Sequence, residues 1–287
     1  MSRSPLAWIT GAGGLIGSHL LQTAHTFAPA WTVRGLTRAQ INLTDFKAIQ
    51  RLFAQDKPGL IVHCAGLTKT PACQQNPELA RQLNVEVTEV LAGLAAEIPL
   101  IFFSSDLVFD GRKGNYVETD PVAPLSIYAE TKAAAEQIVL RNPRHTVVRT
   151  SLNFGVSPAG DRSFNEEHCR EWQTGKSLRL FTDEFRCPIP ASVTARAVWA
   201  LVSAGRPGLY HLAGSARLSR WQIGQLLAAR FPQLHPRIEP VSLREYQGAP
   251  RAPDTSLNCA RLQKLLPFPL PAFGEWLDQI FHCANHP

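Results

Sequence analysis

Ser105, Tyr128 and Lys132 supply a hydroxyl, a phenol and an ammonium that could act together on one carbonyl group. Tyr128 and Lys132 are four residues apart in a segment rich in alanine, glutamate and glutamine, so both side chains should leave one face of a helix. A positive charge beside a phenol eases its ionisation and suits it to general acid or base catalysis near neutral pH. Ser105 follows the apolar run 99–103, a predicted buried strand, and strand ends are where α/β sheets present catalytic groups.

A tyrosine and a lysine at this spacing would by themselves equally describe a solvated pair on a helix surface. A second signal near the N-terminus favours the catalytic interpretation. Glycines stand between an apolar strand, 6–10, and a helical pattern, 18–27. Glycine permits a tight turn and close approach of the backbone to a pyrophosphate at the positive end of a helix. The loop therefore predicts a dinucleotide site, with these candidate cofactor ligands: Gly11, Gly14, Leu15, Ile16 and Gly17.

Together with Tyr128 and Lys132, the segments 10–17, 63–68 and 104–111 resemble the extended short-chain dehydrogenase/reductases. Within them the chain is most similar to the dTDP-4-dehydrorhamnose reductases and their relative, the regulatory beta subunit of methionine adenosyltransferase. The likeness covers nearly the whole chain. It implies an α/β fold, a Rossmann doubly wound parallel sheet with a smaller C-terminal substrate domain.

Strand and helix signals alternate through about residue 150, which predicts a dinucleotide-binding Rossmann domain over 1–150. Past this point the alternation fades. We expect the segments 155–190 and 234–255 to be irregular and the segment 191–214 to return to the sheet. The substrate domain is then expected over 151–190 and 215–287.

Helix boundaries follow from capping residues. Thr44 is the predicted N-cap of a helix that ends before Pro58. Asn76 and Pro77 are predicted to begin a long amphipathic helix, and Ser219 to begin a later one.

The composition describes a soluble globular protein of 287 residues, 45% hydrophobic and 18% charged. No apolar run approaches the roughly 20 residues needed to cross a bilayer, and the N-terminus lacks a signal-peptide pattern, so a cytoplasmic protein without a membrane partner is expected. The cysteines show no C-x-x-C spacing and no clustering with histidine, so we expect reduced thiols, no disulfide and no zinc site. The cysteines are Cys64, Cys73, Cys169, Cys187, Cys259 and Cys283.

Lysine and arginine exceed aspartate and glutamate by 29 to 23. The basic residues are scattered, without a basic stretch or interleaved aromatic residues, which argues against nucleic-acid binding. We expect some arginines to contact the phosphates of a cofactor and of a nucleotide-linked substrate instead.

The sequence favours NADP over NAD. NAD sites usually carry an acidic residue about 20 positions past the glycines, yet no Asp or Glu occurs between Gly11 and Asp45. Thr37 and Arg38 end the predicted second strand, 31–38, and an arginine there would attract the extra phosphate of NADP(H). The alternative is that Arg38 is a solvated loop residue.

The resemblance assigns further roles. Asn42 and Leu43 would border the adenine, although the family more often has Asp at position 42. Asn84 would pack near the active site in a structural role, and His63 fits the core better than a metal site, because it and Cys64 point to opposite strand faces. Small or short residues would line the pyrophosphate and nicotinamide ribose: Cys64, Ala65, Gly66 and Thr68.

Asp106 could reach a substrate or serve as a turn-forming carboxylate, and Asn153 is a further candidate substrate contact. Arg186 and Arg251 are candidates for a substrate phosphate, since planar guanidinium groups pair well with phosphate oxygens; a surface salt bridge is the alternative for Arg186.

The chain departs from the rhamnose reductases at several positions. Leu107 and Leu152 replace a tyrosine and a tryptophan, so two aromatic sugar contacts are absent and specificity for rhamnose is not implied. Some relatives hold a metal through a glycine-loop carboxylate, where this chain has Leu15, so we predict no metal site.

We predict an NADPH-dependent reductase of a 4-keto sugar nucleotide or a close analogue, acting as a monomer or homodimer. Tyr128 would give the proton to the carbonyl oxygen, Ser105 would hold that oxygen, and Lys132 would bind ribose and lower the pKa of the phenol. Two alternatives stay open: epimerase or dehydratase chemistry, and a dinucleotide-binding regulatory subunit like that of methionine adenosyltransferase.

Overall fold

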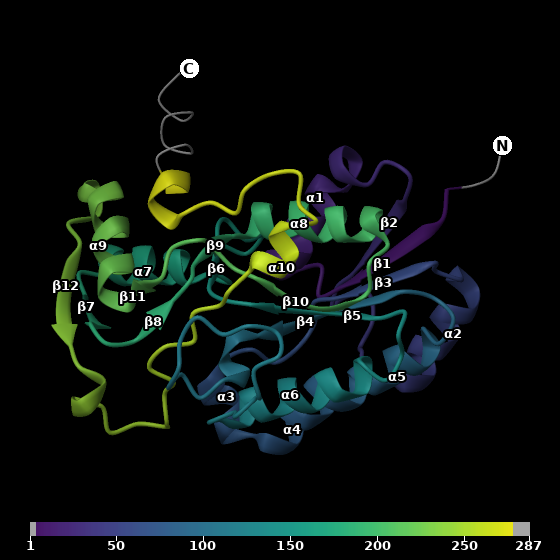
Figure 1. Ribbon diagram of the computed structural model, residues 1–287, viewed down its shortest axis with the longest axis horizontal. Helices are drawn as coiled ribbons and strands as arrows, with labels where there is room; N and C mark the ends of the chain where they lie inside the picture. The colour runs from purple at the N-terminus through teal and green to yellow at the C-terminus, as the bar shows by residue number, and fades with distance from the viewer. Residues whose placement is uncertain (1–3, 278–287) are drawn as a thin grey trace.

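A parallel sheet of six strands forms the centre of the computed structural model, which describes residues 4–277 (Figure 1). Its strands lie in the order β10-β5-β4-β3-β1-β2. The predicted α/β class with a doubly wound parallel sheet is confirmed. The strands are β1 (Leu6–Thr10), β2 (Thr32–Leu36), β3 (Leu60–His63), β4 (Leu100–Ser105), β5 (Thr146–Thr150) and β10 (Gly208–Leu212).

Helices cover both faces of this sheet, above and below it in Figure 1. Ala7 and Ile9 of β1 pack on the face covered by α1 (Leu15–Phe27), α8 (Ala191–Ala204) and α10 (Ala260–Gln263). Trp8, between them, packs on the other face, which α2 (Phe46–Asp56), α5 (Val87–Leu94) and α6 (Ile127–Val139) cover. Strands buried on both faces are mostly apolar, which explains the apolar runs of the sequence.

The strand order fixes where a ligand can bind. β1 pairs with β2 on one side and with β3 on the other, so the connections from these strands leave in opposite directions. In open α/β sheets a crevice forms at the carboxyl ends of the strands at such a reversal.

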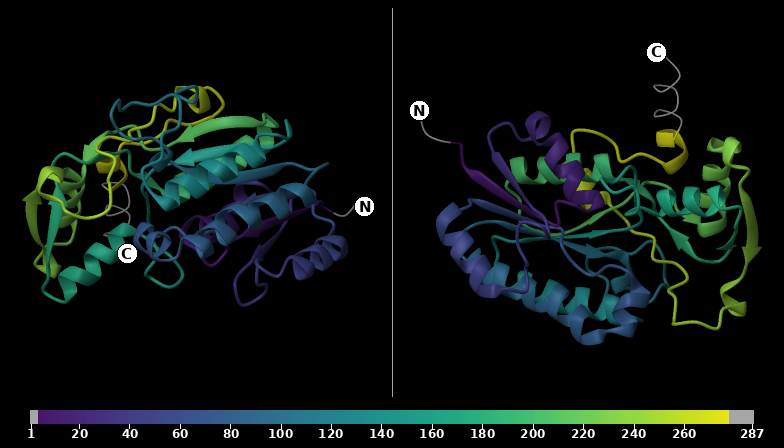
Figure 2. Two further views of the ribbon diagram at one scale, coloured as in Figure 1. Left: turned by 90° about the horizontal axis from the view of Figure 1, so that it is seen from below. Right: turned by 180° about the vertical axis from the view of Figure 1, so that it is seen from behind.

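A smaller lobe lies beside one end of the central sheet in both views of Figure 2. Here β7 (Ser177–Phe181) pairs in parallel with β12 (Arg237–Val241), and α7 (Phe164–Gln173) and α9 (Arg220–Arg230) pack against them. Phe154, Trp172 and Phe273 are buried in its separate core. Two-residue strands connect it to the sheet: β6 (Asn153–Phe154), β8 (Phe185–Arg186), β9 (Ile189–Pro190) and β11 (Leu218–Ser219).

Short helical elements complete the fold. They are α3 (Thr70–Gln75), α4 (Pro77–Arg81), a π-helical turn (Gln82–Glu86), and 3-10 turns at Asp106–Val108, Pro232–Leu234 and Leu243–Glu245.

The capping predictions have mixed outcomes. Asn76 and Ser219 cap their helices as expected, although the π-helical turn interrupts the helix after Asn76. The prediction of Thr44 as an N-cap is wrong by one residue, because the Thr44 hydroxyl donates to Asn42 Oδ1 and Asp45 accepts the capping bond from Ala48.

The prediction of irregular structure in 155–190 and 234–255 is also wrong, because these segments contain α7, β7 and β12. The signal for α7 was present as a Ser-x-x-Glu capping box. The Ser163 side chain accepts from the Glu166 backbone N–H, and the Glu166 carboxylate accepts from the Ser163 backbone.

Cys64, Cys73, Cys169, Cys187 and Cys259 are free thiols, while Cys283 lies outside the described residues. Across residues 4–277, no helix combines the length and apolar character that a membrane span requires, and no three His, Cys, Asp or Glu side chains are grouped to hold a metal.

A buried ion pair ties α6 to β5. Arg149 donates from Nε and Nη2 to the Glu136 carboxylate at 2.9 and 2.7 Å, and both side chains are nearly inaccessible to solvent. We expect Glu136→Ala to lower the free energy of unfolding by about 3–5 kcal/mol, because it leaves a buried guanidinium without a counter-charge. Urea denaturation measures the change.

Glu97→Ala is the matched control, since Glu97 pairs with Arg144 at the surface and should contribute less than about 1 kcal/mol. Equal losses for the two variants would contradict the assigned role of the buried pair.

Candidate active site

One cavity of about 1350 Å³ runs along the carboxyl edge of the central sheet to the smaller lobe. The glycine loop, the ends of β3, β4 and β5, and residues of α6 line one part of it. Residues of the smaller lobe, including Arg186, Arg220 and Arg251, line the other part. The candidate cofactor, catalytic and substrate residues therefore face one continuous space.

The glycine loop has the geometry that a pyrophosphate site needs. Gly11 has a φ of +67°, and a Cβ atom there would lie 2.7 Å from the backbone nitrogen of Ala65. No side chain caps the start of α1 at Gly14, and its first turn carries no acidic residue. The N–H groups of this turn are thus left for an anion, which the helix dipole also favours.

The other candidate cofactor residues line the same cavity, and their contacts to a cofactor remain predictions. Arg38 is exposed, and Thr37 donates from its backbone and hydroxyl groups to Gln40. The full set in the cavity wall is Thr37, Arg38, Asn42, Leu43, Cys64, Ala65, Gly66 and Thr68.

Asn84 has the structural role that the sequence predicted. Its Oδ1 accepts from the backbone N–H of Leu67, and its Nδ2 donates to Leu67 O and Thr131 Oγ1. The side chain thereby fixes the loop after β3 against α6. His63 is likewise a core residue, bonded to Thr10 and Thr88, and burial lowers its pKa to about 3.

The fold brings the three candidate catalytic residues together. Ser105 ends β4, while Tyr128 and Lys132 leave the same buried side of α6. The Ser105 hydroxyl lies close enough to the Tyr128 phenol to influence its pKa. Lys132 Nζ lies 4.0 Å from the centroid of the Phe102 ring.

The direction of the Tyr128 shift corrects the sequence-based expectation. Burial raises the pKa of the phenol, and the charge of Asp106 raises it further, whereas the hydrogen bond to Ser105 lowers it. Burial also lowers the pKa of Lys132 to about 8, against the effect of Glu136. The phenol therefore retains its proton at neutral pH, which suits a proton donor.

Each of the four candidate substrate residues forms hydrogen bonds with other protein groups. Asn153 donates to Thr150 Oγ1 and accepts from Thr194 Oγ1, and Asp106 is buried among hydroxyl groups. Burial raises the pKa of Asp106, while Arg186 and these hydroxyl groups act in the opposite direction.

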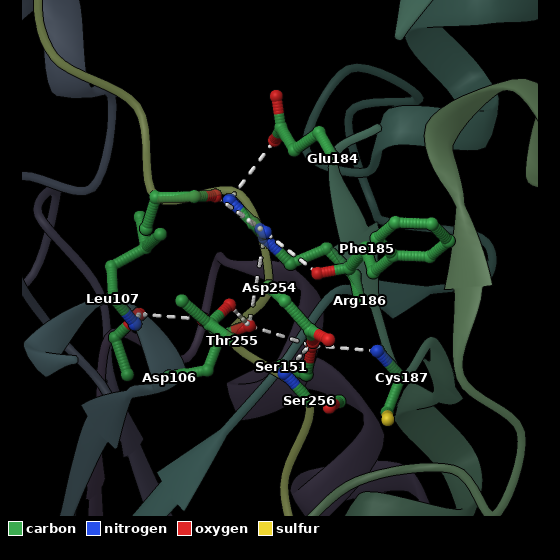
Figure 3. Close-up of polar contacts among 12 residues, drawn as sticks. Asp106, Leu107, Ser151, Glu184, Phe185, Arg186, Cys187, Asp254, Thr255 and Ser256 are labelled. Atoms are coloured by element: carbon green, nitrogen blue, oxygen red, sulfur yellow. Dashed lines mark hydrogen bonds and ion pairs between the residues drawn. The ribbon is translucent and has the colours of Figure 1, made fainter. Parts of the chain in front are cut away.

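The two predicted phosphate ligands share one carboxylate. Arg186 pairs with Glu184 at 3.0 Å and also donates to backbone carbonyls, as Figure 3 shows in part. Arg251 makes two bonds to Glu184, at 2.7 and 3.0 Å. Burial would raise the pKa of Glu184, but Arg251 and Arg186 leave it below its ordinary value. Direct phosphate contact by either arginine remains a prediction.

Arg220 is a cavity residue that the sequence did not reveal. Its guanidinium lies 5.5 Å from the Phe164 ring, and the residue lines the cavity. Burial lowers its pKa to about 10, and the charges of Arg186 and Arg251 also act downward while Glu184 opposes them. The sequence indicated only that a helix starts at Ser219. Arg220 is near Glu184 because the chain folds back there, and the Arg220 backbone N–H donates to Glu184 O.

A sequence profile of the RmlD substrate binding domain family matches residues 7–285. The chain belongs to this family. The resemblance to the extended short-chain dehydrogenase/reductases is thereby confirmed, and the chain is placed among NAD(P)-dependent enzymes of this class.

Individual relatives are similar over nearly the whole chain. Methionine adenosyltransferase 2 subunit beta of Xenopus laevis is 30% identical, covering 96% of this chain and 91% of the relative. The dTDP-4-dehydrorhamnose reductase of Sinorhizobium fredii is 28% identical, covering 93% of each. A crystal structure of dTDP-4-dehydrorhamnose reductase from Bacillus anthracis in complex with NADP shares the fold, with a TM-score of 0.88, 22% identity and coverage of 98% and 99%.

Gly17 provides a direct test of the loop. A Cβ atom there would collide with the backbone of Gly11 and Ala12. We expect Gly17→Ala to weaken NADPH binding at least about tenfold, a loss of about 1.4 kcal/mol, because the loop must shift away from the phosphates. Titration of NADPH fluorescence measures the Kd.

Gly93→Ala serves as the control, because that position on α5 has open space for a Cβ atom and should bind NADPH as the unaltered protein does. Unchanged affinity in Gly17→Ala would exclude the loop as the pyrophosphate site.

Proposed function

We propose that this protein is an NADPH-dependent reductase of a 4-keto group in a nucleotide-linked sugar. One observation carries the proposal: a single cavity joins the glycine loop, the Ser105, Tyr128 and Lys132 set, and three arginines. A cofactor with three phosphates and a substrate with its own phosphates would both find positive groups at opposite ends of this space.

The residues take distinct roles in this reaction. Bound NADPH supplies the hydride that reduces the carbonyl carbon. Tyr128 gives its proton to the carbonyl oxygen, and its burial keeps that proton in place until the negative charge develops. Ser105 donates a hydrogen bond to the same oxygen, and Lys132 holds the ribose.

The smaller lobe supplies the substrate phosphate ligands. Arg220 lines the cavity near Arg186 and Arg251, and Glu184 and Glu167 offset part of the repulsion among these arginines. A bound anion would offset it further. Arg251 is 37% exposed, lies against the rings of Phe181 and Tyr246, and is the second ligand. Leu107 and Leu152 line the cavity where the rhamnose reductases have aromatic residues, so the proposal is for a 4-keto sugar or a close analogue and does not specify rhamnose.

The similarity to the S. fredii reductase and to the NADP-bound B. anthracis structure supports this assignment. The similarity to the methionine adenosyltransferase subunit favours a second candidate, an NADP-binding regulatory subunit. A stable complex with a second type of chain would support that alternative, and turnover by the isolated monomer or homodimer would count against it. Epimerase or dehydratase products would be seen as sugar conversion without net NADPH consumption.

Tyr128→Phe tests the proton donor. We expect a loss of turnover of at least about a thousandfold with nearly unchanged NADPH affinity, since the ring keeps its packing and only the hydroxyl is removed. NADPH consumption is followed with a panel of nucleotide-linked 4-keto sugars, with the variant as the blank. Full activity in Tyr128→Phe would refute the proposed mechanism.

Arg38→Ala tests the cofactor preference. The variant should bind NADPH about ten- to a hundredfold more weakly, because a charged contact to the extra phosphate is lost, and should bind NADH as before. Paired Kd measurements for the two cofactors give the result. A parallel loss for both would show that Arg38 does not select the phosphate.

A further inference from the structure

The carboxylate of Asp106 is the meeting point of four chain segments (Figure 3). Its Oδ1 accepts from the Ser105 hydroxyl at 3.1 Å. Its Oδ2 accepts from Ser151 Oγ at 2.8 Å and from Thr255 Oγ1 at 2.9 Å, and Arg186 Nε lies 3.8 Å away. Three hydroxyl protons and one guanidinium thus point at a single buried carboxylate.

These donors come from distant parts of the sequence. Ser151 follows β5, Arg186 ends β8, and Thr255 lies in the segment that returns from the smaller lobe. Arg186 also donates to Ala252 O at 3.1 Å, and Ser151 accepts from the backbone N–H of Cys187 at 3.2 Å. The Asp106 carboxylate therefore links the end of β4 to residues of the smaller lobe by hydrogen bonds and an ion pair.

The network determines the direction of the Ser105 hydroxyl. A serine hydroxyl has one proton to give and two lone pairs to receive with. The Ser105 hydroxyl donates to Asp106, and its oxygen accepts from the Leu107 backbone N–H at 3.1 Å. These two hydrogen bonds orient the Ser105 side chain beside Tyr128, the phenol whose pKa Ser105 influences.

We propose that Asp106 is a positioning residue: its carboxylate, anchored by Ser151, Thr255 and Arg186, holds Ser105 where a carbonyl oxygen meets both the Ser105 and Tyr128 hydroxyls. This inference rests on the proposed reductase reaction. The hydrogen bond to Asp106 orients the Ser105 side chain before a ketone binds. When the ketone binds, the Ser105 proton turns to the carbonyl oxygen, and the Leu107 backbone N–H keeps the Ser105 oxygen in place. Asp106 therefore acts on the substrate through Ser105 and does not contact the sugar itself.

A double-mutant cycle with Asp106→Asn and Ser105→Ala tests the proposal. The asparagine keeps the size of the side chain but has only one acceptor oxygen for the donors that now share two. We expect kcat of Asp106→Asn to fall about ten- to a hundredfold with KM and NADPH affinity within about threefold. In the Ser105→Ala background, Asp106→Asn should change kcat less than about twofold, because the hydroxyl that Asp106 positions is already absent.

An equal loss of kcat in both backgrounds would overturn the proposal, since Asp106 would then act independently of Ser105. A loss confined to KM would also overturn it, because that pattern belongs to a residue that binds the sugar. If Asp106→Asn fails to fold, Thr255→Val removes one anchor of the carboxylate and should lower kcat a few-fold by the same route, again with no effect in Ser105→Ala.

A crystal structure of Asp106→Asn provides a readout that does not need turnover. We expect the Ser105 side chain to adopt another rotamer, out of hydrogen-bond reach of Tyr128; an unchanged Ser105 would contradict the inference. If the unaltered protein reduces none of the ketones, the proposed function fails, yet this structure still decides whether Asp106 positions Ser105.

Discussion

The parallel direction of the strands is the constraint on which the site depends. Because all strands of the central sheet run the same way, the segments that follow β1, β3, β4 and β5 meet at one edge. As a result, one cavity is lined by the glycine loop, the small-residue turn after β3, and Ser105. α6 completes the set, since it packs beside β4 and presents Tyr128 and Lys132 to the same edge.

Buried charge determines how the smaller lobe meets this edge. Glu184 is 2% exposed and pairs with Arg186 and Arg251, and Arg186 reaches on toward Asp106. Buried charges cost much free energy unless they remain paired. These ion pairs therefore favour one position of the smaller lobe against the sheet. Arg220 lies on the cavity side of this cluster, where its guanidinium could contact an anionic substrate.

The features that the sequence predicted correctly are local. The glycine loop, the apolar strands and the spacing of Tyr128 and Lys132 depend on neighbouring residues, so pattern and propensity were sufficient. The role of Arg220 depends on contacts across the chain and could not be seen. The direction of the Tyr128 pKa was wrong because the charge of a lysine was considered without the burial of the phenol. The helix α7 was missed because most of its residues are polar, so the apolar periodicity was weak. Its Ser-x-x-Glu capping box was nevertheless present in the sequence.

The most direct test of the account follows the hydrogen itself. NADPH deuterated at C4 of the nicotinamide would be incubated with nucleotide-linked 4-keto sugars, and the product analysed by mass spectrometry and NMR. A reductase that uses NADPH in this way places one deuterium on the carbon that carried the carbonyl, in a product that has become an alcohol. Tight binding of NADPH with no deuterium in any sugar would contradict the reductase and favour a regulatory role for the bound dinucleotide.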